Sequence, residues 1–379
     1  MASAALHFTE SFEAQLDDLL FRICNELQLD DTRYKLAVTH YQAVETCLDS
    51  QDSLSRLRPA IYPQGSMRLQ TTVKPLVGEE YDLDLVCQMS CGTTAFYQPV
   101  DALNLIENAL SANEKYAAMI ERKNRCIRLN YEHQFHMDIL PACPDTNRGG
   151  TCLLVPDREL RSWTVSNPKG FAAWFDERAR QRTVFAKAEP IPTPEAVRHK
   201  VPLKLAVQLL KRERDLRYTN KSCAGPISIV LTTLAGNLYR GEESVSMAVG
   251  NILAEIAESV RVSHPRLVVL NPSNRDEDLS ERWDSNPNAY REFANGIADF
   301  KAQWNALSTL RGIDKLARAL ERLFGEQLAK LAIEKQARDI ESARSRNELA
   351  VKKGSGIVTG LASVSSIPVR PNTFYGEAE

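Results

Sequence analysis

The sequence has no large excess of charge of either sign. Its 379 residues carry 47 Lys and Arg against 49 Asp and Glu, which gives a formal net charge of −2. A protein whose main task is to wrap a nucleic acid usually shows a strong basic excess. The balance therefore argues against that class, and we expect no DNA or RNA activator. Local basic clusters remain able to bind small phosphates.

Long apolar runs and closely paired cysteines are also missing. No apolar stretch approaches the roughly 20 residues that span a bilayer, and the N-terminus lacks the basic region of a secretory signal. The eight cysteines include no C-x-x-C pair, so we interpret them as reduced thiols. These absences predict a cytoplasmic protein that does not associate with membranes.

The apolar pattern divides the chain into an α/β half followed by a helical half. Helical spacing predicts two N-terminal helices, at 12–27 and 32–48, that pack on a sheet. A strand is predicted at 81–88 and a hairpin from 125–131 and 135–140. Residues 141–194 are rich in Pro, Gly, Asn and Asp, which indicates loops and short elements.

Helical periodicity returns from residue 195 onward. An apolar stripe runs through 201–210, and further helices are predicted at 227–239, 244–260, 290–304 and 309–344. We therefore expect an α+β protein with a core at 1–190, a helical domain at 195–349 and a flexible tail at 350–379.

Three acidic residues in the predicted sheet are the most informative feature. Asp82 and Asp84 share one face of a strand, about 7 Å apart, because side chains alternate along a strand. Asp138 lies in a second, strongly apolar strand, where an unpaired carboxylate is costly. If the strands are neighbours, three like charges meet. A divalent cation keeps all three ionised, and oxygen ligands suit Mg²⁺.

The acids predict a metal-dependent phosphoryl or nucleotidyl transfer site. With two Mg²⁺ ions, which Mn²⁺ can replace, one metal would clamp a donor triphosphate and the other would activate an attacking hydroxyl. In-line attack on the α-phosphate then expels pyrophosphate. We expect Asp138 nearest the attacking hydroxyl.

Candidate phosphate ligands flank these acids. The Gly65-Ser66 turn precedes them, and a glycine lets backbone N–H groups approach phosphate oxygens. Lys211 ends the apolar stripe and is the best candidate to offset phosphate charge. Its alternative interpretation is a surface lysine at a helix end. Ser228 is a second candidate, with an alternative role as a helix-start hydroxyl.

Taken in order, these motifs resemble the bacterial CD-NTases, the cyclic-oligonucleotide synthases related to cyclic GMP-AMP synthase and oligoadenylate synthase. The resemblance spans about residues 64 to 283. In the first half it rests on segments 64–66, 71–75, 81–86, 137–141 and 166–170, and in the second half on 206–212, 226–228, 270–274 and Trp283.

The resemblance implies a polymerase-β-like nucleotidyltransferase core, made of a mixed sheet with helices, packed against a C-terminal helical domain, with the active site in the cleft between them. It implies that Asp82, Asp84 and Asp138 bind the metals. The other residues that it places at the nucleotides are Gln64, Gly65, Ser66, Lys211 and Ser228 on phosphates, and Ser166 and Asn167 on bases.

The resemblance further implies a cyclic di- or trinucleotide made from ribonucleoside triphosphates, ATP among them, in bacterial anti-phage defence. Some members of the family are conjugated through their C-terminus by ubiquitin-like transfer enzymes, and the end of this chain could serve that role or be a simple tail. Two other functions remain open at this point. One is a different nucleotidyl transfer, to an RNA 3′ end or to a protein, and the other is an inactive nucleotide-binding signalling module.

Overall fold

The computed structural model describes residues 2–179, 191–221, 223–310, 312–346, 350–352, 358–359 and 366–368. A seven-stranded mixed sheet forms the first half, in the order β1-β2-β5-β4-β3, with β6 joined to β5 and β7 to β6. Only the β2–β5 pair is parallel among the pairs described in this sheet. The strands are β1 (Ala60–Pro63), β2 (Tyr81–Gln88), β3 (Ile120–Arg122), β4 (Ile127–Tyr131), β5 (Phe135–Pro144), β6 (Leu153–Asp157) and β7 (Ser162–Ser166).

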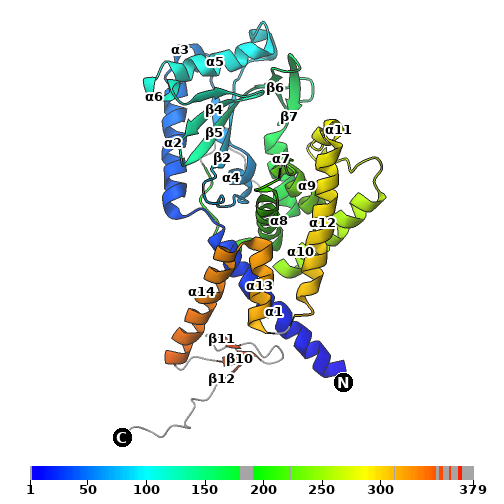
Figure 1. The fold of residues 1–379 in the computed structure, drawn as a ribbon. Coiled ribbons are helices and arrows are strands. Elements are labelled where there is room, and N and C mark those ends of the chain that lie inside the picture. Colours follow the sequence, from blue (N-terminus) through cyan, green and yellow to red (C-terminus); the bar gives the residue numbers. More distant parts are fainter. Residues whose placement is uncertain are drawn as a thin grey trace.

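Alternation of apolar and polar residues gives the central strands two different faces. On β5, Phe135, Met137 and Ile139 are buried, whereas His136 and Asp138 lie between them on the opposite, more open face. Strands β2 and β4 alternate in the same way. The apolar face packs against α2 (Asp31–Asp49) and α5 (Pro99–Ser111), whose buried residues belong to the same core cluster. Figure 1 shows both helices beside the sheet. The polar face is left for the site.

A second core belongs to the helical half, whose helices Figure 1 shows gathered apart from the sheet. Its central helix is α8, in which every residue from Leu203 to Glu213 is buried. Around it lie the longer helices of this half, and a short hairpin of β8 (Leu270–Asn271) and β9 (Asn274–Asp278) extends from them. The helices are α8 (Pro202–Tyr218), α9 (Ser228–Leu238), α10 (Val245–Val262), α11 (Arg282–Ser285), α12 (Pro287–Leu307), α13 (Ile313–Phe324) and α14 (Glu326–Ser345).

The first helix departs from the prediction. We expected both N-terminal helices to pack on the sheet, but only α2 does. The buried side chains of α1 (Ala2–Glu26), such as Leu20 and Ile23, belong to the core of the helical half, and α1 contacts α14, α10 and α8. Helical periodicity shows that a helix has an apolar face, but it does not show which neighbour covers that face.

Two further predictions need correction. The helix predicted at 309–344 is broken at Gly325, whose φ of +96° leaves the helical region and separates α13 from α14. The region at 141–194, predicted as loops and short elements, contains the 11-residue helix α7 (Pro168–Arg178), which begins with a proline and is capped by Asn167. An Asn-Pro pair can mark either a turn or the start of a helix, and here it starts α7.

The remaining elements are short. They are α3 (Asp52–Ser55), α4 (Gly65–Leu69), α6 (Glu114–Ala117) and, within the predicted tail, β10 (Ala350–Lys352), β11 (Val358–Thr359) and β12 (Ser366–Pro368). These last strands form a small sheet of their own, whereas residues 369–379 lie outside the described part of the chain. Among the described helices, none combines the length and the apolar character that crossing a membrane requires.

Candidate active site

The sheet brings the three predicted acids together. Strands β2 and β5 run parallel with Asp84 directly opposite Asp138, and Asp82 lies opposite His136. Because all of these positions are on the polar face, the carboxylates point into the same region. The predicted arrangement of the two strands is therefore confirmed.

Burial and neighbouring negative charges disfavour the ionised form of the central carboxylate, Asp84. Asp84 is enclosed, and burial followed by the negative charges of Asp82 and Asp138 raises the pKa of Asp84 from 3.8 to about 7. The side chain of Asp82 is 55% exposed, whereas that of Asp138 is 17% exposed. Because the three carboxylates disfavour one another's ionisation, a bound cation would stabilise their charged forms.

An arginine that was not predicted from the sequence places positive charge beside these carboxylates. Arg128 on β4 lies opposite Asp138. Its Nε donates to Asp138 Oδ1 at 2.7 Å, its terminal nitrogen to Asp138 Oδ2 at 2.8 Å, and the same nitrogen to Asp82 Oδ1 at 3.3 Å. The hydrogen bonds to Asp138 raise the pKa of Arg128, which stays charged. Both oxygens of Asp138 are therefore occupied by one guanidinium.

The residues fit a hard divalent cation by their chemistry, although not yet by their positions. All three candidates are carboxylates, the ligand type that Mg²⁺ prefers. Within the described part of the chain, no three His, Cys, Asp or Glu side chains are arranged so that they could hold a metal ion together. The ion pair with Arg128 accounts for this, because Asp138 has to leave the guanidinium to ligate a metal.

Arg128 and a metal ion thus compete for Asp138. We expect Arg128→Gln to bind Mn²⁺ more tightly than the unmodified protein, by about 10-fold, which corresponds to one charge-assisted contact of roughly 1.4 kcal/mol. Titration of the nucleotide-free protein with Mn²⁺, followed by electron paramagnetic resonance, measures this affinity. Arg125→Gln, on the loop before β4, is a control that leaves the acids untouched, since Arg125 pairs with Asp157. Weaker Mn²⁺ binding by Arg128→Gln would show that the arginine supports the site instead.

Asp82 has a second support on the neighbouring strand. His136 Nδ1 lies 3.4 Å from Asp82 Oδ1, and His136 Nε2 lies 2.9 Å from Glu80 Oε2. The backbone N–H of His133 also donates to Glu80, at 2.7 Å. The imidazole therefore lies between two carboxylates, and Glu80 is itself fixed by the backbone.

The predicted Gly-Ser turn lies against the same acid. Gly65 starts α4 with φ of +60°, and an added Cβ would lie 2.3 Å from Asp84 Oδ2. The backbone N–H of Gln64 donates to the Asp84 carbonyl at 2.8 Å, and Ser66 Oγ accepts a hydrogen bond from Thr72 at 3.1 Å. The sequence predicted that the glycine lets the backbone approach a phosphate, and the structure adds that glycine is needed for Asp84 to fit.

A cavity of about 440 Å³ connects these elements with the helical half. Asp82 and Asp84 line it from the sheet, and Lys211, Arg214 and Ser228 line it from α8 and α9. The other predicted site residues that line it are Gln64, Gly65, Ser66, Ser166 and Asn167, whereas Asp138 lies just behind the lining residues, paired with Arg128. The cavity thus brings together residues that are far apart in the sequence.

Lys211 is a buried cation and not a surface lysine. Its side chain is 4% exposed, and Nζ donates to the carbonyl and the hydroxyl of Thr71, both at 3.2 Å. Burial, and then the charge of Arg214, lower the pKa of Lys211 from 10.5 to about 7. A buried lysine that faces a cavity gains from an anionic ligand, because the ligand restores its charge. The alternative interpretation as a helix-end surface residue was therefore wrong.

Ser228 supports a second cation that the sequence analysis missed. Arg214, one helical turn after Lys211 on α8, donates to Ser228 Oγ at 3.1 Å and to the Pro226 carbonyl at 3.0 Å. Asp215 also contacts the guanidinium, at 2.7 Å. Ser228 is thus at the start of α9, as its alternative interpretation held, and it also positions Arg214 at the cavity.

The two predicted base contacts differ in their surroundings. Ser166 ends β7 and lines the cavity. Asn167 is 8% exposed, and its side-chain oxygen accepts from Gly170 N at 3.0 Å and from Thr151 at 2.8 Å, while its amide nitrogen donates to the Ser273 carbonyl at 3.2 Å. These contacts do not support a role in reading a base, because the amide already caps α7 and joins it to the β8–β9 hairpin.

Comparisons with known proteins agree on one family. Residues 15–179 match the Second Messenger Oligonucleotide or Dinucleotide Synthetase domain. A c-di-GMP synthase of Roseivirga ehrenbergii is 31% identical over 377 residues, which cover 97% of this chain and 99% of the relative. The cyclic dinucleotide synthase CdnG of Bradyrhizobium diazoefficiens is 24% identical, over 97% of this chain and 96% of the relative.

Solved structures show the same fold. The Bradyrhizobium diazoefficiens CdnG in complex with GTP has a TM-score of 0.69 at 23% identity, over 85% of this chain and 99% of that one. The Escherichia coli CdnC with ATP has a TM-score of 0.61 at 12% identity, over 82% and 97%. The predicted class, a polymerase-β-like nucleotidyltransferase core with a helical half, is therefore confirmed.

Proposed function

The chain belongs to the bacterial CD-NTases, the cyclic-oligonucleotide synthases, and we propose that it joins two molecules of GTP into a cyclic dinucleotide with release of two pyrophosphates. The choice of guanine is supported by the Roseivirga relative, which is named as a c-di-GMP synthase, and by the GTP in the Bradyrhizobium structure. ATP as a substrate, which we expected from the sequence, stays a prediction. The ring of two nucleotides narrows the earlier expectation of a di- or trinucleotide.

The observation that carries this proposal is the cavity that joins an acidic sheet face to two cations of α8, buried Lys211 and half-buried Arg214. Asp82, Asp84 and Asp138 would hold two divalent cations, with Mg²⁺ as the first candidate and Mn²⁺ as its substitute. Such ions neutralise a triphosphate and lower the pKa of an attacking hydroxyl. We assign Gln64, Gly65 and Ser66 to the donor phosphates, together with Lys211 and Arg214, whose charges are already directed at the cavity.

The wall of the cavity explains what the residues themselves contribute. Gly65 lets the turn lie against Asp84, so the backbone of α4 and the acids contact the same phosphates. Lys211 is held by Thr71 and Arg214 by Ser228, so neither cation has to be ordered when a nucleotide binds. Positioning of this kind supplies much of the rate enhancement in phosphoryl transfer.

Two alternatives were left open by the sequence. Transfer to an RNA 3′ end or to a protein, and an inactive binding module, share the same core. Relatives that align over nearly the whole of this chain are named as cyclic dinucleotide synthases, which favours ring formation over both. We include anti-phage defence, a cytoplasmic location and C-terminal conjugation in the proposal, although residues 369–379 at the end of the chain lie outside the described part.

Incubation with each labelled ribonucleoside triphosphate, alone and in mixtures with Mg²⁺, tests the proposal. We expect a product from GTP alone that resists phosphatase, because a ring has no terminal phosphate. A phosphatase-sensitive product, or label transferred to added RNA or to the protein itself, would support the other nucleotidyl transfers. Binding of nucleotide without turnover under all conditions would support the inactive module.

A further inference from the structure

The cavity has one carboxylate on its helical side that the proposed chemistry does not use. Glu277 lies on β9 and lines the cavity together with Asn271 of β8. The Asn271 side chain, which is 4% exposed, donates to Glu277 Oε2 at 2.7 Å. Among the described residues, no lysine, arginine or histidine pairs with Glu277. The other acid on this side, Asp215, is paired with Arg214.

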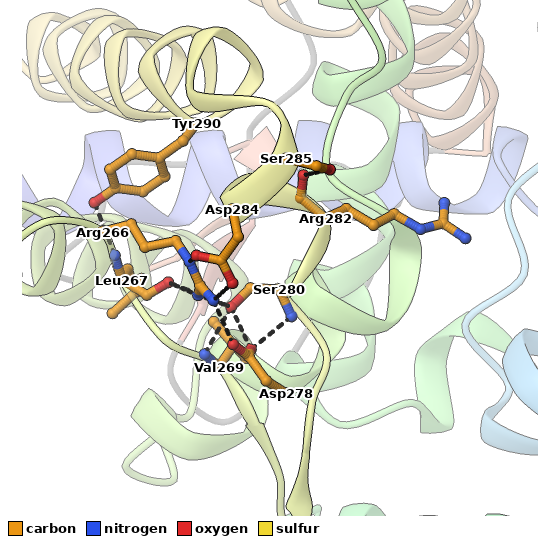
Figure 2. A network of polar contacts seen from close by, with 9 residues as sticks. All are labelled: Arg266, Leu267, Val269, Asp278, Ser280, Arg282, Asp284, Ser285 and Tyr290. Carbon is orange, nitrogen blue, oxygen red and sulfur yellow. Dashed lines mark hydrogen bonds and ion pairs between the residues drawn. The ribbon is translucent and has the colours of Figure 1, made fainter. Parts of the chain in front are cut away.

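The hairpin that carries Glu277 is fixed firmly at its base, as Figure 2 shows. Arg266 donates to Asp278 at 2.7 Å, to Asp284 at 2.6 Å and to Ser280 Oγ at 3.0 Å. Ser280 returns two hydrogen bonds to Asp278, through its N–H at 2.8 Å and its hydroxyl at 2.6 Å. Asp278 follows Glu277 directly in the chain, so the strand cannot rotate without breaking this network.

The tip of the hairpin is fixed to the nucleotidyltransferase core. Ser273 donates to the Asn167 carbonyl at 3.1 Å and accepts from the Asn167 amide, and Asn274 donates to the Val165 carbonyl at 3.4 Å. A side chain held at both ends of its hairpin is pre-organised, and such side chains suit recognition.

The electrostatics decide what Glu277 can bind. A carboxylate only accepts hydrogen bonds, so its partner must be a donor. Nucleotide phosphates are anionic and would be repelled, and they are matched instead by Lys211 and Arg214. The remaining donors on a nucleotide are on its base and ribose. Among the four bases, only guanine presents two adjacent N–H donors, N1–H and the 2-amino group, whereas adenine presents an acceptor at N1.

We propose that Glu277 determines base specificity by accepting hydrogen bonds from the N1–H and 2-amino groups of a guanine, with Asn271 as the positioning residue that fixes its carboxylate. This inference rests on the proposed function, because that function places a nucleotide in this cavity. A site built to receive N–H donors discriminates strongly against a base that lacks them, since its buried polar groups are then left unpaired.

Equilibrium binding of non-hydrolysable triphosphate analogues with Mg²⁺ tests this inference without turnover. We expect the unmodified protein to bind the GTP analogue more tightly than the ATP and inosine analogues. Glu277→Gln should weaken the GTP analogue by at least ~10-fold and leave the ATP analogue unchanged or tighter, because an amide can donate to adenine N1 and accept from its amino group. The difference in affinity between the GTP analogue and the inosine analogue should disappear in the variant.

Asp276→Asn is the matched control, because Asp276 precedes Glu277 on the same strand, is exposed and pairs with Arg148 on the surface. We expect its base preference to match the unmodified protein. Equal weakening of all three analogues by Glu277→Gln, or no change at all, would overturn the inference. A thermal unfolding midpoint equal to that of Asp276→Asn shows that the variant is folded. The product assay on the unmodified protein is separate, so a failure of cyclisation is distinguishable from a failure of guanine reading.

Discussion

Alanine at both Asp82 and Asp84 will lower the rate of pyrophosphate release by at least ~10³-fold, because the variant loses carboxylate ligands for the divalent cations that would neutralise the triphosphate. The two carboxylates face the cavity from one strand, and Asp84 is the less exposed of the pair. A coupled pyrophosphate assay with GTP and Mg²⁺ measures the loss. Retained activity would refute the assignment of these acids.

Asp84→Asn separates catalysis from folding. Because burial and two neighbouring carboxylates disfavour a charge at this position, the neutral amide should leave the metal-free protein as stable as before or more stable. The same variant should be inactive. Glu132→Ala, an exposed acid in the turn between β4 and β5, is the control for activity and stability. Parallel loss of stability and activity in Asp84→Asn would indicate a structural role for the carboxylate.

Gly65→Ala is expected to have the second largest effect, a loss of turnover of at least ~100-fold. The new Cβ would lie 2.3 Å from Asp84 Oδ2, and the backbone φ of +60° is unfavourable for a side chain. The collision displaces either the acid or the turn, and both contact the same phosphates in the proposed complex. Steady-state kinetics with GTP, together with thermal unfolding, measure the two consequences.

Gly78→Ala separates the collision from the backbone strain. Gly78 also has a positive φ, +85°, but an added Cβ would meet no atom within 4 Å. Both variants should lose roughly 1 kcal/mol of stability to the positive φ, and Gly65→Ala should lose more because of the collision with Asp84. Only Gly65→Ala should lose activity beyond the amount that instability explains. Equal loss of activity in the two variants would show that contact with Asp84 is unimportant.

The sequence predicted the acids because strand periodicity is local information. Asp82 and Asp84 are two residues apart, and apolar Leu83 between them fixes their shared face. Arg128 was within reach of the same reasoning. In the predicted hairpin, Tyr131 pairs with Phe135, and counting back three residues on one strand and forward three on the other places Arg128 opposite Asp138. The pairing of a hairpin therefore carries site information that a search for acids alone omits.

Other features depended on contacts that no local pattern contains. The amphipathic face of α1 gave no indication that it would join the helical core. The sequence predicted Asn167 as a base contact, whereas its hydrogen bonds with Thr151 and Ser273, which lie far from it in the chain, became visible only in the fold. Glu277 was unremarkable in an acidic stretch, because its importance arises from a cavity wall assembled from distant segments.

Mass spectrometry of the product made from GTP alone, followed by nuclease digestion, tests the central claim most directly. We predict one product with the mass of a ring of two guanosine monophosphates, formed together with two pyrophosphates, and absent with the Asp82 and Asp84 double variant. A linear dinucleotide that keeps its 5′-triphosphate as the final product, or an unchanged pool of GTP in the presence of Mg²⁺ or Mn²⁺, would contradict the proposed function.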